Sequence, residues 1–79
     1  MSTPRDSWIA ANPIQLGRVL AGARRESGLT QQQLADRVYV DRSYLARMES
    51  GLATEQVART FAVLRELGLE LRVVTKADA

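Results

Sequence analysis

Apolar positions between residues 30 and 51 follow two short helical repeats separated by a break. Leu34, Ala35 and Val38 form an apolar stripe at i, i+1 and i+4, and Leu45 and Met48 continue it at i and i+3 after the break. The spacing predicts two short helices joined by about four residues, with a small alanine where the helices would touch. This arrangement is typical of a helix-turn-helix.

Polar residues frame both predicted helices. Thr30 is a candidate N-cap for the first helix, and Gln33 stands three residues later, at the capping-box position. Asp41 is a candidate cap for the second helix, where its carboxylate also suits the positive end of the helix dipole. Gly51 is a C-terminal stop for that helix.

The second predicted helix carries a polar face that a core does not require. Arg42, Ser43, Ala46 and Arg47 fall at i, i+1, i+4 and i+5, on the side away from Leu45. Arginine presents a flat fork of donors that matches a guanine edge or a phosphate. A solvated surface would explain a polar stripe taken alone, but the caps, the turn length and the basic face together favour a recognition helix for the DNA major groove.

Two further helices flank this segment. Asn12-Pro13 is a helix start, and the helix that follows carries apolar residues at i, i+3, i+4 and i+7, ending before Gly28. These residues are Leu16, Val19, Leu20 and Ala23. Gly17 and Gly22 weaken this helix by up to about 1 kcal/mol each, so tertiary packing must hold it.

The last predicted helix begins at the cap Thr54 and closes at Leu67-Gly68. Its apolar face, at i, i+4, i+7 and i+10, predicts a core or dimer surface rather than a ligand site. The residues of this face are Val57, Phe61, Leu64 and Leu67.

The chain ends are predicted to differ from each other. Residues 69–75 alternate in hydrophobicity, which favours a strand over a frayed fifth helix. A single strand needs a neighbour and no other segment reads as one, so the expected partner is the same segment of a second copy. Residues 1–11 are expected to form a flexible arm whose Trp8-Ile9 either packs on the bundle or anchors another protein, and residues 76–79 a disordered tail.

Composition narrows the function. The chain has 79 residues, which predicts one small domain with a thin core that relies on a partner or on oligomerisation. It contains no His and no Cys, so disulfides, zinc sites and His-dependent triads are excluded, and we expect a non-enzyme without metal or cofactor in a reducing cytoplasm. No apolar run approaches the roughly 20 residues of a membrane span, and no signal-peptide pattern is expected.

Net charge is only +2, but its placement is uneven. Through Ser50 there are seven basic and five acidic residues, whereas four of each follow. The excess therefore lies on the half that would meet phosphate. Because the excess is modest, a monomer should bind DNA weakly, and a dimer would double the contacts.

The segment resembles the helix-turn-helix of the Cro/C1 repressor family, the XRE-type regulators. The residues that carry the resemblance are Arg24-Arg25, Gly28-Leu29-Thr30-Gln31, Leu34-Ala35, Asp41 and Glu49-Ser50-Gly51. The match extends from about Leu16 to Gly68. It implies a lambda-repressor-like four-helix helix-turn-helix bundle over residues 12–68. Together with the strand that the alternation predicts, the expected fold is mainly α with a short C-terminal dimerisation β-strand over residues 69–75.

Two departures from the family pattern matter. The family usually has glycine where this chain has Tyr39, and because a tyrosine with positive φ is strained, the turn is expected to take a different conformation. After Gly51 the family usually carries Lys or Arg and Pro, whereas this chain has Leu52-Ala53-Thr54-Glu55. One phosphate contact is therefore expected to be missing.

The resemblance also implies residue roles. It pairs Arg24 with Glu49 as a structural ion pair, and it assigns Gln31 to a phosphate and to bracing the first side chain of the recognition helix. The expected base-reading residues are Arg42, Ser43 and Arg47; the expected DNA-backbone residues are Thr30, Gln31, Gln32 and Tyr44; the expected dimer residues are Leu69, Leu71 and Val73.

The ending Leu67-Gly68-Leu69-Glu70-Leu71 with its short strand resembles the HipB-like antitoxins. This resemblance implies a homodimeric repressor that binds a palindromic operator in double-stranded DNA, regulates its own type II toxin–antitoxin operon and binds a HipA-like kinase toxin. Two alternatives remain open at this point: a stand-alone Cro/C1-type repressor without a toxin, and a protein-interaction module that does not use DNA. No membrane and no small-molecule substrate is expected.

Overall fold

The computed structural model describes residues 7–52 and 54–76. Within these residues the chain forms four helices and a short antiparallel sheet of two strands. The elements are β1 (Ser7–Ala10), α1 (Pro13–Glu26), α2 (Gln31–Val38), α3 (Arg42–Glu49), α4 (Glu55–Glu66) and β2 (Leu71–Val74). The predicted class, a mainly α helix-turn-helix bundle with a C-terminal strand, is confirmed.

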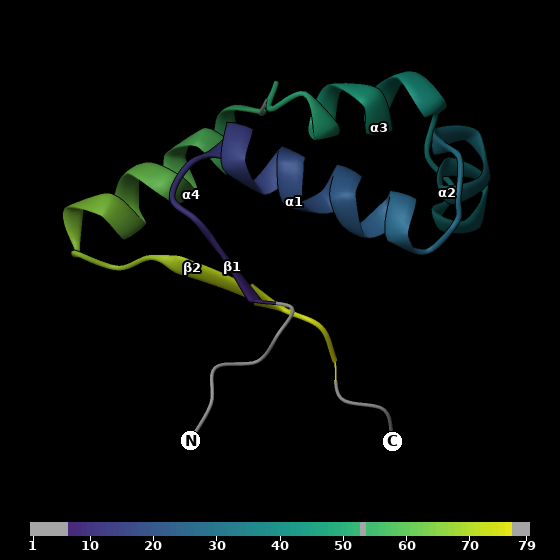
Figure 1. The fold of residues 1–79 in the computed structure, drawn as a ribbon. Coiled ribbons are helices and arrows are strands. Elements are labelled where there is room, and N and C mark those ends of the chain that lie inside the picture. Colours follow the sequence, from purple (N-terminus) through teal and green to yellow (C-terminus); the bar gives the residue numbers. More distant parts are fainter. Residues whose placement is uncertain (1–6, 53, 77–79) are drawn as a thin grey trace.

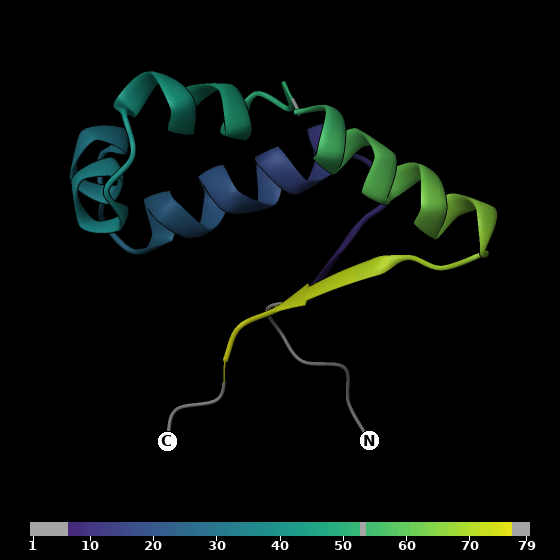
Figure 2. The same ribbon diagram turned by 180° about the vertical axis from the view of Figure 1, so that it is seen from behind.

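The helices are arranged around α1. In both ribbon views α3 runs alongside α1, α2 lies across the end of this pair, and α4 extends from the opposite end (Figures 1 and 2). The two strands lie below the helices, on the side of α1 away from α3. The sheet is therefore remote from the outer surface of α3.

Side-chain caps begin three of the four helices. The Asn12 Oδ1 accepts from the backbone N–H of Gln15 at 2.8 Å, and Thr54 caps α4 in the same way. Thr30 and Gln33 form the complete capping box, with reciprocal bonds of 3.1 and 2.9 Å. Asp41 occupies the N-cap position of α3, but its side chain makes no cap hydrogen bond, so that part of the prediction is wrong.

The turn between α2 and α3 keeps a left-handed residue although that residue is a tyrosine. Tyr39 has φ 60° and ψ 42°, and the N–H of Val40 donates to the Ala35 carbonyl at 3.1 Å. The expectation of a different turn conformation is therefore wrong. Because the Tyr39 side chain is 94% exposed, it clashes with nothing, and the cost is confined to its own backbone.

Small residues make the contact between α1 and α3. Gly17 and Ala21 are the buried residues of α1. Of the predicted apolar face, Leu16, Val19 and Leu20 are part-buried, whereas Ala23 is exposed, contrary to the prediction. A Cβ on Gly17 would lie 2.5 Å from the backbone oxygen of Glu49, so the two helix backbones touch here. The sequence prediction missed this contact surface of α1 because the helical repeat was assigned mainly from large apolar side chains.

The remaining core is thin. The buried hydrophobic residues of the described chain are Ala10, Ala21, Ala35, Leu45 and Phe61, three of them alanines. Val38 and Met48, predicted on the apolar face, are 52% and 38% exposed. Met48 lines a hollow of about 420 Å³ where the end of α3 meets the starts of α1 and α4, which explains its exposure.

The sheet joins the two ends of the described chain. Trp8 pairs with Val73 and Ala10 pairs with Leu71 in an antiparallel register. Ala10 is fully buried, and β1 packs on α1. The predictions that residues 7–10 belong to a flexible arm, and that β2 would find no partner within its own chain, are both wrong.

The reason for this error lies in strand length. Ser7–Ala10 is four residues long and ends in alanines, so it carries too little alternation to be recognised as a strand. Its counterpart β2 begins at Leu71, which leaves Leu69 and Glu70 in the connection from α4. The strand assigned to residues 69–75 is thus confirmed at its centre, the fifth-helix alternative is wrong there, and the disordered tail predicted from residue 76 lies, beyond Lys76, outside the described residues.

Candidate nucleic-acid interface

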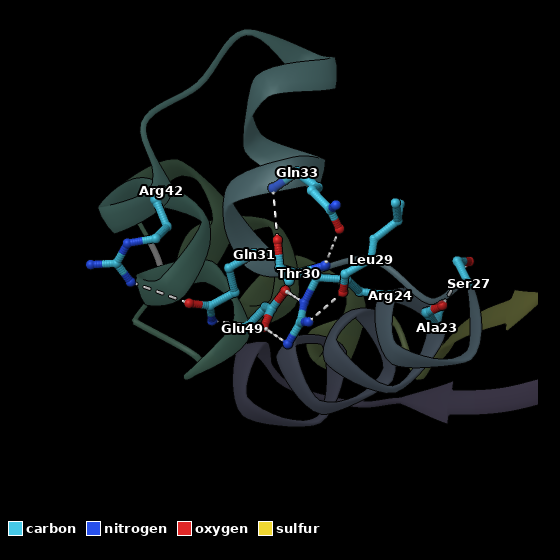
Figure 3. Close-up of polar contacts among 9 residues, drawn as sticks. All are labelled: Ala23, Arg24, Ser27, Leu29, Thr30, Gln31, Gln33, Arg42 and Glu49. Atoms are coloured by element: carbon cyan, nitrogen blue, oxygen red, sulfur yellow. Dashed lines mark hydrogen bonds and ion pairs between the residues drawn. The ribbon is translucent and has the colours of Figure 1, made fainter.

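A buried ion pair joins the end of α1 to the end of α3. The Arg24 Nε donates to Glu49 Oε2 at 2.7 Å, and Arg24 Nη2 donates to Oε1 at 3.1 Å (Figure 3). The two side chains are only 10% and 5% exposed. Arg24 Nη1 also donates to the Leu29 carbonyl at 2.8 Å, which fastens the loop between α1 and α2. The ion pair implied by the resemblance is present.

The electrostatics of this pair favour the charged state of Glu49. The hydrogen bond from Arg24 lowers the pKa of the Glu49 carboxyl below its ordinary value of 4.5, and this effect outweighs burial, which acts to raise it. A second hydrogen bond, from Gln31, lowers the pKa of Glu49 further. The carboxylate is therefore ionised at neutral pH and can only accept hydrogen bonds.

Gln31 extends this network to the surface. Its Nε2 donates to Glu49 Oε1 at 3.0 Å, and its Oε1 accepts from Arg42 Nη1 at 3.3 Å (Figure 3). The first residue of α2 is thereby brought against the first residue of α3. The bracing of the first recognition-helix side chain by Gln31, which the family resemblance implied, is present in the structure.

The outer face of α3 presents the polar residues that the sequence singled out. Arg42, Ser43 and Arg47 are all exposed, while Leu45 on the opposite face is 4% exposed and packs into the core. Tyr44 is 47% exposed and lines the same hollow as Arg47. The helix thus has one face fixed in the protein and one face free to enter a groove.

The start of α2 holds the other residues predicted to meet the DNA backbone. The hydroxyl of Thr30 is engaged as the helix cap, and Gln32 Nε2 donates to Asp36 Oδ1 at 2.8 Å. Gln31 is half-buried because its amide is bound between Glu49 and Arg42. These intramolecular bonds order the side chains at the end of the molecule where α2 and α3 begin.

The predicted dimer residues lie elsewhere. Leu69 and Leu71 are 55% and 37% exposed, whereas Val73 is half-buried opposite Trp8. The structure therefore does not bring these residues together with α3. They belong to the half of the molecule that contains the sheet.

Sequence reasoning missed two features that shape this surface. Gly17 sets how closely α1 approaches α3, and the only signal for it was a glycine inside an otherwise helical pattern. Gly51 has φ +85°, and a Cβ there would lie 2.6 Å from the Cα of Ile14. Both glycines fix the position of the α3 C-terminus on α1, and with it the direction of the exposed face.

Over 7–52 and 54–76, no three acidic side chains gather as the ligands of a metal ion would. In the same ranges, no helix has the length and apolar character needed to cross a bilayer.

Comparison with known families agrees with this geometry. A family profile described as a helix-turn-helix domain matches residues 15–72, which include all four helices except the first two residues of α1. Neither the curated proteins nor the solved structures yield a match. Helix-turn-helix domains of this kind are DNA-binding modules of regulators and are typically non-enzymatic.

Proposed function

Because the chain belongs to the helix-turn-helix domain family, we propose that it is a sequence-specific DNA-binding repressor of transcription and not an enzyme. In this proposal α3 enters the major groove with its N-terminal part toward the base edges. Arg42, Ser43 and Arg47 read bases, with Arg42 the best placed to contact a guanine. Thr30, Gln31, Gln32 and Tyr44 position the protein on the phosphate backbone.

One observation carries this proposal above the others. The exposed face of α3 is held on a scaffold that is fixed at several independent points: the Arg24–Glu49 ion pair, the Gln31 bridge and the backbone contact at Gly17. A solvated surface needs no such support. A reading surface does, because a misplaced side chain loses its hydrogen bonds to a base edge.

We propose further that the active form is a homodimer. Within the described residues, α4 and the sheet region leave large apolar side chains in solvent while the core holds few. The most exposed of these are Leu67 (65%), Val63 (57%), Leu69 (55%) and Ile9 (50%). A second copy that covers this region would bury them and would hold two α3 helices for two half-sites about 34 Å apart, as a palindrome requires.

Because β2 pairs with β1 of its own chain, the argument for a dimer differs from the one that the sequence suggested. Within the described residues the antiparallel sheet has two strands, and each has an outer edge that no described strand covers, so β2 can still pair with its counterpart in a second copy. The argument for association therefore rests on uncovered apolar surface and a free strand edge, and no longer on a strand without a neighbour.

We also propose, on the sequence resemblance to HipB-like antitoxins alone, that the repressor belongs to a type II toxin–antitoxin operon. It would repress that operon in the cytoplasm and bind a HipA-like kinase toxin. The exposed apolar residues of α4 and Trp8, 39% exposed, offer surface for such a partner. A stand-alone repressor without a toxin is the simpler form of the same function.

The experiment that tests DNA recognition is selection from a random double-stranded library, followed by binding titrations at several salt concentrations. We expect enrichment of a palindrome and, for about six phosphate contacts per dimer, a loss of affinity on the order of 10³-fold between 50 and 200 mM salt. Arg42→Ala should lose discrimination at one base pair per half-site. Recovery of no enriched sequence, with no salt-dependent binding, would refute the proposal and favour a protein-interaction module.

The antitoxin proposal has its own test. The gene next to this one should encode a kinase-like protein, and co-expression of the two should yield a complex that survives size-exclusion chromatography. A neighbourhood without such a gene, together with retained operator binding, would leave the stand-alone repressor as the function.

A further inference from the structure

A chain of hydrogen bonds runs from the interior of the protein to the DNA-reading surface. It passes from Arg24 to Glu49, from Glu49 to Gln31, and from Gln31 to Arg42 (Figure 3). Glu49 lies at the C-terminal end of α3, and its side chain is 5% exposed. Glu49 therefore does not reach DNA itself, yet it is two hydrogen bonds away from the side chain that we expect to read a guanine.

Glu49 determines which end of the Gln31 amide points outward. A glutamine amide has a donor end and an acceptor end that are nearly equal in shape, so shape alone does not choose between them. An ionised carboxylate accepts only, so the Gln31 Nε2 must face Glu49 Oε1, at 3.0 Å. Gln31 Oε1 then necessarily faces the start of α3.

An outward-facing acceptor restricts what can stand at the first position of α3. Arg42 satisfies it by donating from Nη1 at 3.3 Å, which leaves the other guanidinium donors for DNA. A side chain at position 42 that can only accept hydrogen bonds would be repelled by the Gln31 oxygen. A donation to the Glu49 carboxylate also polarises the Gln31 amide and strengthens its oxygen as an acceptor.

We propose that Glu49 is a positioning residue for base recognition: through Gln31 it orients Arg42 and selects for a hydrogen-bond donor at position 42. This inference rests on the proposed DNA-binding function. It assigns different roles to the two partners of the ion pair. Arg24 stabilises the fold, whereas Glu49 both stabilises the fold and governs base selectivity.

The test compares Glu49→Ala with Arg24→Ala, two variants that break the same ion pair. Both should melt at lower temperature than the wild type. In Arg24→Ala one support of α3 is lost, but the Gly17 contact and the hydrogen bond from Gln31 to Glu49 remain, so discrimination at the base pair contacted by Arg42 should stay within about twofold of wild type. In Glu49→Ala the Gln31 amide is free to turn, and discrimination at that base pair should fall about tenfold.

A double-mutant cycle shows whether the effect passes through Arg42. In an Arg42→Ala background, Glu49→Ala should cause no additional loss of discrimination. An additional loss in that background would overturn the proposal, as would equal discrimination by Glu49→Ala and the wild type.

A measurement on the unmodified protein keeps the proposal testable if Glu49→Ala does not fold. In NMR spectra of the ¹⁵N-labelled chain without DNA, the side-chain amide protons of Gln31, assigned with Gln31→Met, should be shifted and slow to exchange. They should move toward free-amide values as Glu49 is protonated in acid. Free-amide behaviour at neutral pH would overturn the proposal, whereas a failure to bind DNA selectively would overturn only the proposed function and leave this result standing.

Discussion

The two halves of this small protein are held together in different ways. In the half formed by α1, α2 and α3, helix caps, a buried ion pair and a glycine contact fix each element against the next. In the half formed by α4 and the sheet, Phe61 and Ala10 are the buried hydrophobic residues, and large apolar side chains remain exposed. The difference fits the proposal that the reading half is shaped within one chain, whereas the other half is completed by a second copy.

The largest expected effect tests the glycine contact in the first half. Gly17→Ala should lower the free energy of unfolding by about 3 kcal/mol, because its Cβ would lie 2.5 and 2.6 Å from two backbone oxygens of α3. Urea unfolding followed by circular dichroism measures this change. Gly22→Ala is the matched control on the same helix: its Cβ meets nothing within 4 Å, so it should stabilise the protein by up to about 1 kcal/mol. Effects of equal sign would contradict the helix contact.

The second effect compares an ion pair from each half. Glu49→Ala should cost roughly 2–4 kcal/mol, since it leaves the partly buried Arg24 without its partner. Glu55→Ala removes the exposed Glu55–Arg59 pair of α4 and should change stability by less than about 0.5 kcal/mol. Thermal melts of the two variants give the comparison, and equal melting temperatures would show that the buried pair contributes nothing special.

The third effect concerns the half that we expect to be completed by a second copy. Leu67→Lys places a charge among exposed apolar residues and should weaken dimerisation by about 2–3 kcal/mol for the two copies together. Because Leu67 is 65% exposed in the single chain, the monomer should lose little stability. Sedimentation equilibrium over a range of concentrations measures the dissociation constant, with Arg65→Lys as control. An unchanged dissociation constant would place the dimer contact elsewhere.

A smaller effect is expected from acid. The pKa of Glu49 is lower in the folded protein than its ordinary value, so the stability that Glu49 contributes is complete above about pH 4.5 and is lost as the pH falls through the lower folded-state pKa. Unfolding free energies measured across this acid range should therefore fall more steeply for the wild type than for Glu49→Gln. Parallel curves would mean that the Glu49 carboxyl titrates alike in the folded and unfolded chains.

The smallest effect concerns the turn between α2 and α3. Tyr39→Gly should stabilise the protein by about 0.5–1 kcal/mol, because glycine adopts the left-handed conformation without strain and the exposed tyrosine side chain packs on nothing. Tyr44→Gly, inside α3, should instead destabilise by about 1 kcal/mol. Chemical unfolding of both variants decides the point, and a loss of stability in Tyr39→Gly would indicate that its side chain has a role in the turn.

Sequence reasoning predicted the half formed by α1, α2 and α3 better than the half that contains the sheet, because short-range patterns encode most features of the first half. Caps, stops and the Arg24–Glu49 pair are encoded by short-range spacing or by a specific motif, and the structure contains all of them except the side-chain bond of Asp41. The pairing of Trp8 with Val73 joins residues far apart in sequence. No local pattern encodes such a contact, and a strand of four residues carries too little periodicity to suggest it.

The candidate site shows the same division. The residues on the exposed face of α3 followed from helical periodicity, but the outward orientation of the Gln31 amide depends on Glu49, eighteen positions away. The close approach of α1 to α3 at Gly17 likewise depends on the backbone of another helix. Both features need the tertiary structure, because each is a contact between elements rather than a property of one.

The pairing of β1 with β2 also has a consequence for how the chain folds. Ser7–Ala10 precedes all four helices in the chain, and its partner Leu71–Val74 follows them. The helices between them are joined by more local contacts and can form first, whereas the sheet needs the long intervening segment to be closed. We therefore expect the sheet and the surface beside it to be the last part of this domain to form, so that a second copy could cover that surface only after the helices have packed.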